Sequence, residues 1–345
     1  MPSSSFRRLC LVGTLLALCV IVLGAWVRLS HAGLGCPDWP GCYGHLTAGG
    51  AVENAAAANA AHPGRPLEAD KAFKEMVHRY FASALGLLIV LAAMLALRNR
   101  RDPAQPVRLP AALVLLVVFQ GLLGMWTVTL LLKPLIVSAH LVGGLTTMSL
   151  LWWLSFDVAP GERPAAERRL RSWAIVGLIA LALQIMLGGW VSSNYSAIAC
   201  PDFPTCQASF WPDMDFSDAF VLWRGLGIDY EGGVLDHPAR VAIHVTHRIG
   251  AVVVAFVLGY VSWLAVRTGQ SPAVRAAGGI VGAVLITQLV VGPVMVMKTF
   301  PLWLATAHNA VAALLLLSVV ALTRFLFVPG ARPAPGRTAP AMAPK

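Results

Sequence analysis

Long apolar runs separated by short polar segments extend over almost the whole chain. An apolar run of about 20 residues is long enough to cross a bilayer as a helix. The runs predict eight transmembrane helices, at residues 9–29, 76–97, 110–130, 135–156, 172–192, 242–265, 277–297 and 303–326. The first run follows Arg7 and Arg8, but it is too long for a signal-peptide core and has no clear cleavage site, so we expect it to be retained.

Composition and charge strengthen this interpretation. Of the 345 residues, 57% are hydrophobic and only 12% are charged, which excludes an ordinary soluble protein of this length. With a cytoplasmic N-terminus, the cytoplasmic segments hold 16 of the 26 Lys and Arg residues but only 4 of the 16 acidic residues. Because positive charge marks the inner side of a membrane, this distribution of the net charge of +10 predicts an N-in, C-in membrane protein. It indicates contact with membrane lipid and not with nucleic acid.

Segments of the first half of the chain recur in the second half. Four pairs align: 24–42 with 188–206, 75–79 with 244–248, 120–128 with 288–296, and 138–140 with 306–308. Each half then has four helices and a long outer loop, at 30–74 and 193–240 respectively. We therefore predict an all-α polytopic protein of two pseudo-symmetric four-helix bundles, related by an axis along the membrane normal. The halves are residues 1–160 and 161–328, and the Pro- and Ala-rich tail 329–345 is expected to be disordered in the cytoplasm.

Four histidines occupy equivalent positions in the two halves: His78 and His140, then His247 and His308. Each is predicted to begin the second or the fourth helix of its half, which places all four imidazoles at one depth, near the outer surface. Polar groups in apolar helices tend to be functional, and paired imidazoles on facing helices commonly hold haem iron. Hydrogen bonding at a helix end is the alternative, and copper bound by histidine and methionine also stays open. A closed zinc site is less favoured, because neither half has a nearby thiolate or carboxylate pair.

The two halves differ three residues before the first histidine of each pair. The first half has Glu75 there, and the second half has His244. Residues three apart share a helix face, so Glu75 is expected beside His78, where a carboxylate can exchange protons with a bound group. The alternative is an interfacial acid that pairs with a nearby cation, either Lys71, Lys74 or Arg79. The asymmetry indicates that one half holds a permanent cofactor while the other carries out chemistry.

Two further kinds of polar residue recur in the repeat. Arg79 and Arg248 directly follow the histidines and are candidates for contacts with haem propionates, because a guanidinium binds a carboxylate through two donors. Extension of the side chain to the membrane interface is the alternative. Gln120 and Gln288 are expected to be interhelical hydrogen-bond donors.

Each outer loop contains the motif C-P-D-aromatic-P-x-C. The histidines that flank the first motif would complete a zinc site, but the second motif lacks them. Disulfides persist on the outer face of a membrane, and the prolines bend each loop so that its ends can meet. We therefore predict the disulfides Cys36–Cys42 and Cys200–Cys206, and a reversible thiol relay remains open.

The remaining parts of the outer loops are expected to cover the bundles. Residues 48–61 are rich in alanine and are expected to form a short helix over the first bundle. Residues 207–239 are acidic and aromatic and are expected to cap the second bundle at the membrane interface.

The chain resembles the haem A synthase family over residues 10–325. The resemblance rests on five motifs: EMVHR with Glu75 and His78, VSAHLVGG with His140, IHVTHR with His247, ATAHNA with His308, and CPDWPGC. It implies haem b as the cofactor between His247 and His308. It also implies that the substrate, haem O, binds near His78 and His140, and that Glu75 is catalytic.

The resemblance further implies a reaction and partners. The C8 methyl group of haem O would be oxidised to the formyl group of haem A, by two successive hydroxylations and loss of water. Haem O synthase, the assembly of terminal oxidases and an unidentified electron acceptor are the implied partners. The alternatives are a quinone-linked diheme electron-transfer protein and a haem chaperone of oxidase assembly. Both account for the histidines, but neither accounts for a glutamate in only one half.

Overall fold

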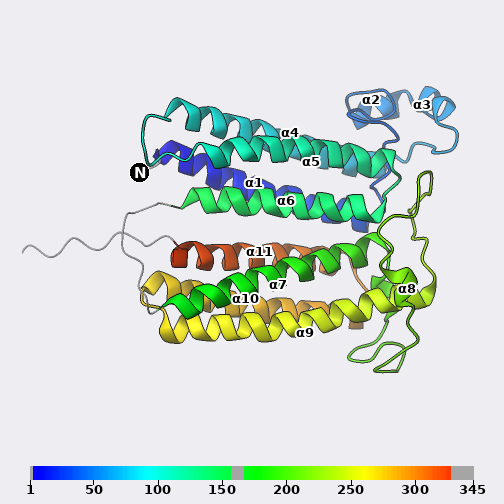
Figure 1. Ribbon diagram of the computed structural model, residues 1–345. Helices are drawn as coiled ribbons and strands as arrows, with labels where there is room; N and C mark the ends of the chain where they lie inside the picture. Colours follow the sequence, from blue (N-terminus) through cyan, green and yellow to red (C-terminus); the bar gives the residue numbers. More distant parts are fainter. Residues whose placement is uncertain (1–2, 157–166, 328–345) are drawn as a thin grey trace, which may run out of the picture.

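The structure is a computed structural model that describes residues 3–156 and 167–327. Within these residues, eight helices are long and apolar enough to cross a membrane, so the predicted number is confirmed. They are α1 (Ser4–Leu29), α4 (Ala69–Arg98), α5 (Arg108–Thr129), α6 (Pro134–Ser155), α7 (Arg168–Ser193), α9 (His237–Thr268), α10 (Pro272–Met297) and α11 (Leu302–Phe327). They lie side by side in Figure 1. The predicted disordered tail, 329–345, lies outside the described residues.

Local sequence determines where several helices begin. The hydroxyl of Ser3 accepts a hydrogen bond from the backbone N–H of Phe6, and Ser271 caps α10 through the N–H of Val274. Proline occupies the first turn of α6, α9 and α10, where its missing N–H leaves no helical hydrogen bond unmade.

All eight of these helices begin before their predicted apolar runs, by one to seven residues. α4 starts seven residues and α9 five residues earlier than the hydrophobic pattern predicts. The added first turn of α4 is polar, and an ion pair between Lys74 and Asp70, four residues apart, supports it. Hydrophobicity therefore marks the part of each helix that suits the bilayer, and not the point where the helix begins.

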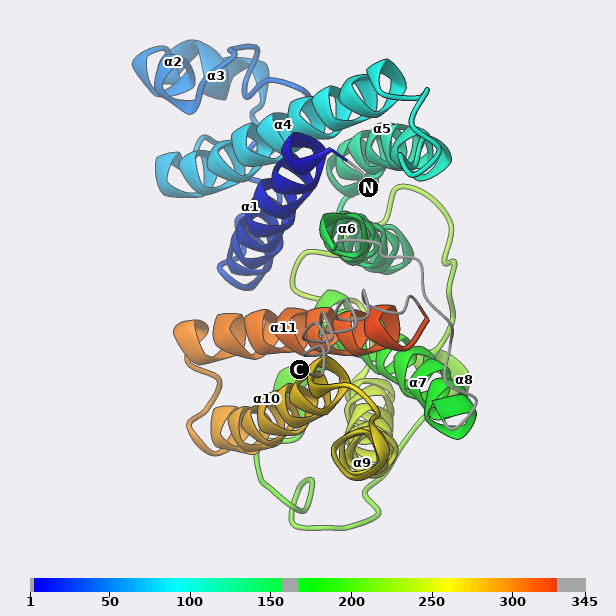
Figure 2. The same ribbon diagram turned by 90° about the vertical axis from the view of Figure 1, so that its left-hand side faces the viewer.

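The helices form two groups, each contiguous in sequence. In the first group α1 packs against α4 and α6, and α5 packs against the same two helices. In the second group α7 packs against α9 and α11, and α10 packs against the same two helices. The order of contacts is the same in both groups, which lie one above the other in Figure 2.

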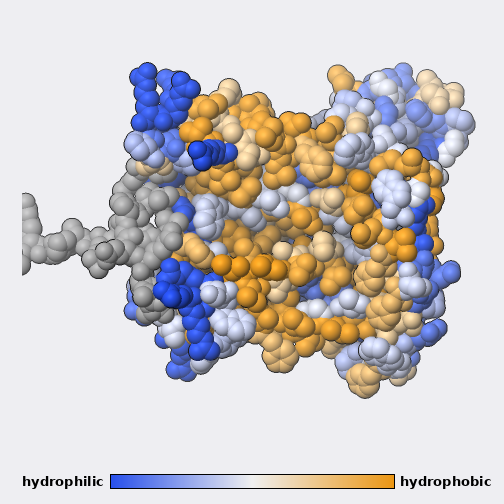
Figure 3. All heavy atoms as spheres, viewed as in Figure 1, coloured by the Kyte–Doolittle hydropathy of each residue, from blue (hydrophilic) through white to orange (hydrophobic). Residues whose placement is uncertain are grey.

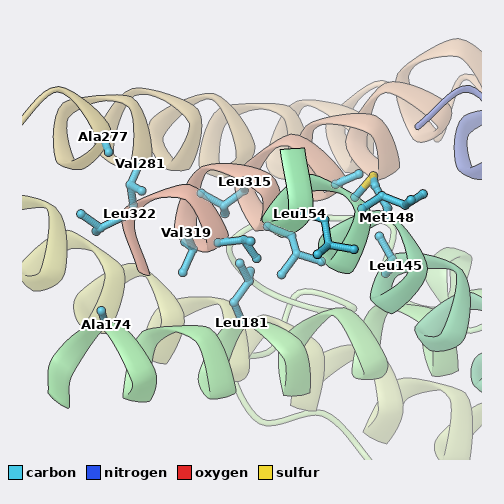
Figure 4. Packing of buried hydrophobic residues seen from close by; sticks show 14 of the residues in the cluster. Leu145, Met148, Leu154, Ala174, Leu181, Ala277, Val281, Leu315, Val319 and Leu322 are labelled. Carbon is cyan, nitrogen blue, oxygen red and sulfur yellow. The ribbon is translucent and has the colours of Figure 1, made fainter. Parts of the chain in front are cut away.

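The two groups share one apolar core. α6 contacts α7 and α11, and α1 contacts α11. Met148 of α6, Leu181 of α7 and Leu315 of α11 belong to a single cluster of buried residues, part of which is shown in Figure 4. The indole Nε1 of Trp152 in α6 also donates a 3.0 Å hydrogen bond to the carbonyl of Leu317 in α11. Packing of this kind joins the halves along their length.

The outer surface is apolar around the middle of the helices. Figure 3 shows hydrophobic side chains over this middle region and polar side chains at both ends. Leu115 is 74% exposed and Phe256 is 76% exposed, which would be unfavourable in water but suits contact with lipid. This distribution is expected of a multi-pass membrane protein.

The long loops lie together at one end of the helices (Figure 1). The first loop contains α2 (Ala48–Glu53) and α3 (Ala55–Ala61), so the predicted short helix is present in two pieces, and α2 packs against α4. The second loop contains the 3₁₀ helix η2 (Ala197–Ala199) and α8 (Phe216–Ala219), both packed against α9. This part of the second loop covers its own bundle, as predicted.

Residues 223–231, here called the crossing segment, do not follow that prediction. They extend to the first half, where the N–H of Tyr230 donates a 3.1 Å hydrogen bond to the carbonyl of Leu131. Asp229 also forms an ion pair with Arg65, with 2.6 Å between the carboxylate oxygen and the guanidinium nitrogen. The expectation that residues 207–239 cap the second bundle therefore holds for α8 but not for the crossing segment.

A buried cation accounts for the position of the crossing segment. Lys133, directly before α6, is only 2% exposed, and a buried ammonium group is costly unless acceptors surround it. The crossing segment supplies them, because the Lys133 ammonium donates to the carbonyl of Gly225 and lies 3.5 Å from the ring centroid of Trp223.

Candidate functional site

The four repeated histidines lie well inside their helices. His78 is nine residues after the start of α4, and His247 is ten residues after the start of α9. His140 and His308 are each six residues after the start of α6 and α11. At ~1.5 Å per residue these positions are ~9–15 Å from the helix ends. The prediction that the histidines begin their helices is wrong for His78 and His247, because polar turns extend α4 and α9 beyond their apolar runs. The helices α6 and α11 begin within one residue of the predicted positions, so His140 and His308 lie in the second turn as the sequence indicated.

The two histidines of each half lie on helices that share their packing partners: α4 and α6 both pack against α1 and α5, and α9 and α11 both pack against α7 and α10. All four side chains are half-buried. Among the described residues there is no group of three or more His, Cys, Asp or Glu side chains that could hold a metal ion.

Each imidazole packs against a glycine of the transmembrane helix that precedes its own. The distance from Cε1 of the histidine to a Cβ atom built on that glycine is 2.9 Å for Gly24 and His78, 3.5 Å for Gly124 and His140, 3.2 Å for Gly188 and His247, and 3.3 Å for Gly292 and His308. A Cβ would overlap the ring of His78 and would be tight against His247 and His308, whereas at Gly124 it would make ordinary contact with His140. The contact recurs at equivalent positions of the repeat.

Glu75 is buried at the junction of α4 and the first cysteine loop. Only 4% of the residue is exposed. Its Oε2 atom accepts a 2.9 Å hydrogen bond from the backbone N–H of Cys36, and its Oε1 atom pairs with the guanidinium of Arg79. Of the cations considered from the sequence, Arg79 is therefore the partner, while the two nearby lysines pair with other acids. The carboxylate lies one helical turn before His78.

The arginines after the histidines hold the cysteine loops against the helices. Nη1 of Arg79 donates to the carbonyls of Asp38, at 3.0 Å, and of Gly41. In the second half Arg248 donates to the carbonyls of Thr205, at 2.7 Å, and of Asp202, at 2.8 Å. Simple extension to the membrane interface does not describe these side chains. Their contact with haem propionates stays a prediction.

His244 takes the place of Glu75 in the second half, and the arginine that follows it still binds the cysteine loop. Nε of Arg248 lies 3.3 Å from Nε2 of His244, so the arginine again contacts the residue four positions before it. The ring of His244 also packs edge-on against Phe300, with 6.4 Å between ring centroids. The second half therefore has an imidazole at the position where the first has a carboxylate.

Both cysteine pairs form disulfides, as predicted: Cys36–Cys42 and Cys200–Cys206. An aspartate organises each loop from inside. Asp38 accepts from the backbone N–H groups of Tyr43, at 2.6 Å, and Gly44, at 2.7 Å. Asp202 accepts from Gln207, at 2.6 Å, and Ala208, at 3.0 Å, and a hydrogen bond from the Thr205 hydroxyl lowers the pKa of Asp202. Since the cysteines are bonded to each other, they cannot serve as zinc ligands in this state.

Comparisons with known proteins show the family of this chain. The family model described as cytochrome oxidase assembly protein, COX15-CtaA, matches residues 7–320. The chain belongs to this family. It is 43% identical over 323 residues to the heme A synthase of Shewanella oneidensis, covering 93% of this chain and 95% of that protein. It is also 28% identical to the heme A synthase of Caulobacter vibrioides, over 86% of this chain and 89% of that protein. The identity to the heme A synthase of Methylobacterium radiotolerans is 29%, over 90% of this chain and 87% of that protein.

One polar residue that contacts a site histidine was not predicted from the sequence. Gln184 of α7 donates a 2.9 Å hydrogen bond from its amide to the carbonyl of His247. A single glutamine inside the apolar run 172–192 was the available signal, but its counterpart in the first half is Val20, so the repeat did not mark it. Gln120 is an interhelical donor, as predicted, through a 2.9 Å hydrogen bond to the carbonyl of His140.

Proposed function

We propose that the chain is a haem A synthase that oxidises the C8 methyl group of haem O to the formyl group of haem A. The family match and the 43% identity to a heme A synthase support the activity. The mechanism that we propose rests on a difference between the two halves. Each half brings together a pair of imidazoles, and only the first places a buried carboxylate, Glu75, beside that pair.

The residues present fit two haem groups. In each half the two imidazoles come from helices that pack against the same two neighbours, so they can face each other across the bundle and would hold one iron between them. Glycines let the rings sit close to the helix packed beside them. We assign the substrate haem O to His78 and His140, and haem b to His247 and His308. When bound, haem b supplies a centre for one-electron transfer.

Glu75 is the residue assigned to proton handling. Conversion of a methyl to a formyl group removes electrons and protons from the carbon, and the released protons need an acceptor nearby. Glu75 has its carboxylate fixed by Cys36 and Arg79, so it is held in one position beside His78. These two contacts hold the proposed proton acceptor in place while the first cysteine loop keeps its conformation.

A cleft between the two outer loops lies next to the residues that surround Glu75, although Glu75 itself does not line it, and we propose that protons leave in this direction. Its volume is about 240 Å³, and its lining includes Gly35, the neighbour of Cys36, and Lys71, one helical turn before Glu75. Charged side chains from both halves complete the lining, among them Arg65 and Glu231. Such a polar cleft can hold water that carries protons away.

The same proposal includes topology and partners. The excess of Lys and Arg in the loops opposite the cysteine motifs supports an N-in, C-in orientation, with both haem sites near the extracytoplasmic side of the bacterial inner membrane. The identical order of helix contacts supports a pseudo-two-fold relation between the halves. Haem O synthase is the expected donor of substrate, and terminal oxidase assembly is the expected destination of the product.

Production of haem A in a heterologous membrane tests this function. The chain is co-expressed with a haem O synthase in a host that makes no haem A, and extracted haems are separated by chromatography and identified by mass. Haem A and its hydroxymethyl precursor are expected. If membranes that contain the folded, haem-loaded protein hold neither product, the diheme electron-transfer protein or the haem chaperone becomes the better explanation.

The glycine beneath each imidazole gives a second prediction. Gly188→Val is expected to displace the His247 ring, at a cost of about 1–3 kcal/mol in stability for overpacking, and to lower the haem b content of the purified protein severalfold. Gly259→Val is the matched control, because a Cβ at Gly259 meets no atom within 4 Å. Haem-to-protein ratios measure the effect, and equal ratios in the two variants would contradict it.

A further inference from the structure

Arg28 lies where the two halves of the protein meet, at the end of α1 that leads into the first outer loop. It belongs to the last turn of that helix, and its Nη2 atom donates a 2.6 Å hydrogen bond to the carbonyl of Ser192 at the end of α7. Its guanidinium carbon lies 4.1 Å from the ring centroid of Tyr195 in the second half. Residues 28 and 192 are equivalent in the repeat, but only the first is charged, so a cation from the first half occupies this junction.

The same face of α1 carries the glycine that packs against a site histidine. Gly24 lies four residues before Arg28, and a Cβ atom built on it is 2.9 Å from Cε1 of His78. Residues four apart are neighbours on one face of a helix, separated by about 6 Å along its axis. Arg28 therefore projects from α1 one turn beyond the contact with His78, on the side of the outer loops.

Arg28 has no carboxylate partner in the described parts of the chain. Its Nε atom is buried and makes no hydrogen bond, and none of the ion pairs within residues 3–156 and 167–327 includes it. A buried guanidinium N–H without an acceptor is unfavourable, and buried charges are normally paired. The other basic side chains near this end of the first half already have partners: Arg65 with Asp229, Lys71 with Glu68, Lys74 with Asp70, Arg79 with Glu75, and Lys133 with the Gly225 carbonyl. Arg28 is the basic residue of this region that an added anion would satisfy.

Haem carries such an anion. Haem O and haem b each have two propionate carboxylates along one edge of the ring, and a carboxylate is unfavourable in an apolar helix bundle unless a cation accompanies it. A guanidinium suits this group, because its planar donors can bind both carboxylate oxygens. Arg79, considered for this contact from the sequence, is engaged by Glu75 and by carbonyls of the first cysteine loop, whereas Nε of Arg28 is free to donate.

Haem b in the second half is the other possible source of the carboxylate. Ser192, whose carbonyl Arg28 contacts, lies four residues after Gly188, the glycine that packs against His247. The helix that carries Arg28 favours the first half, because α1 packs against α4 and α6, the two helices that carry the histidines of that half.

We propose that Arg28 binds a propionate carboxylate of the haem in the first half, and that the ring of Tyr195 holds the guanidinium in position. The inference rests on the proposed assignment of the substrate haem to His78 and His140. Both halves then build the substrate site, since the second half supplies the ring and the carbonyl that orient the cation. This gives the second half a role in substrate binding besides its proposed haem b.

Haem binding by the purified protein tests this role. The protein is prepared with its haem b from a host without haem O synthase, and ferric haem O or its dimethyl ester, in which both carboxylates are masked, is added. Absorbance titration gives the affinity for each, and His140→Ala identifies the signal of the first half. The wild type is expected to bind haem O about 10- to 100-fold more tightly than the ester, the usual value of a hydrogen bond to a charged group.

Arg28→Gln is expected to weaken haem O binding by about 10- to 100-fold and to leave binding of the ester unchanged. Arg98→Gln is the matched control, because Arg98 is an exposed arginine in the last turn of α4, at the opposite end of the helices. It is expected to keep the wild-type preference for haem O. Arg28→Lys, which keeps the charge but loses the planar donors, is expected to lie between the wild type and Arg28→Gln.

A purely structural role would weaken the binding of haem O and of the ester alike, so an unchanged preference in Arg28→Gln overturns the inference. If that variant does not fold, a wild-type affinity for haem O in Arg28→Lys overturns it. Loss of haem b in Arg28→Gln with an unchanged preference would place the carboxylate in the second half and overturns it too. Absence of haem A in the co-expression experiment removes the proposed activity, and the preference for haem O over its ester still decides the role of Arg28.

Discussion

Glu75→Gln is expected to reduce haem A formation by about 10²- to 10⁴-fold, the usual contribution of a positioned proton acceptor. Glutamine is nearly isosteric and can still accept the hydrogen bond from the N–H of Cys36, so the first cysteine loop should keep its place. The amide cannot take up a proton, and this is the property that the proposed mechanism requires. Haem A and hydroxymethyl haem are quantified by chromatography and mass, together with the haem b content of the same membranes.

Glu53→Gln is the matched control for this variant. Glu53 is the exposed last residue of α2 and does not line the cleft beside Glu75, so its loss should leave haem A formation unchanged. Normal haem A formation in Glu75→Gln would remove this residue from the mechanism. Loss of haem b in Glu75→Gln would instead show that Glu75 has a structural role in the fold.

His247→Ala or His308→Ala is expected to eliminate bound haem b, the second large effect. Under the proposed assignment these two imidazoles would hold haem b together, so removal of either one would leave the cofactor with a single protein ligand and a much weaker hold. The absorption spectrum and the haem b content of the purified protein measure the loss. His237→Ala, at the exposed start of α9, is the matched control and should retain haem b. An unchanged haem b spectrum in the His247 and His308 variants would show that the cofactor is bound elsewhere.

Much of the fold could be predicted because the bilayer imposes a simple pattern on sequence. A span must be apolar over its full length, so each of the eight helices is visible as a run of hydrophobic residues. Duplication made the site visible as well, because a histidine that recurs at an equivalent position is marked out from other polar residues. The cysteine motifs were predictable for the same reason.

The parts that were missed depend on contacts and not on local pattern. Helices α4 and α9 extend beyond their apolar runs through polar turns, and nothing in a hydrophobic profile marks where such turns begin. Gln184 was overlooked because its counterpart, Val20, is apolar, so a search for shared residues could not select it. Its role is defined by a neighbouring helix, which hydropathy does not reveal.

The position of the crossing segment also has a long-range cause. Lys133 precedes α6, while the groups that surround its ammonium lie about ninety residues later, in the second outer loop. No local sequence feature relates the two, since the requirement for acceptors arises only when Lys133 is buried by the fold. Sequence patterns therefore predicted the bundles and their repeated residues, but not the contact that joins their outer loops.

The crossing segment changes how the two halves can move. The chain connects α6 to α7 at one end of the helices, and at the other end Asp229 and Tyr230 attach the second half to Arg65 and Leu131 of the first. A pair of bundles joined at both ends has little freedom to open like a hinge. Passage of a substrate into the first half is therefore expected to depend on movements among α1, α4, α5 and α6, and not on separation of the halves.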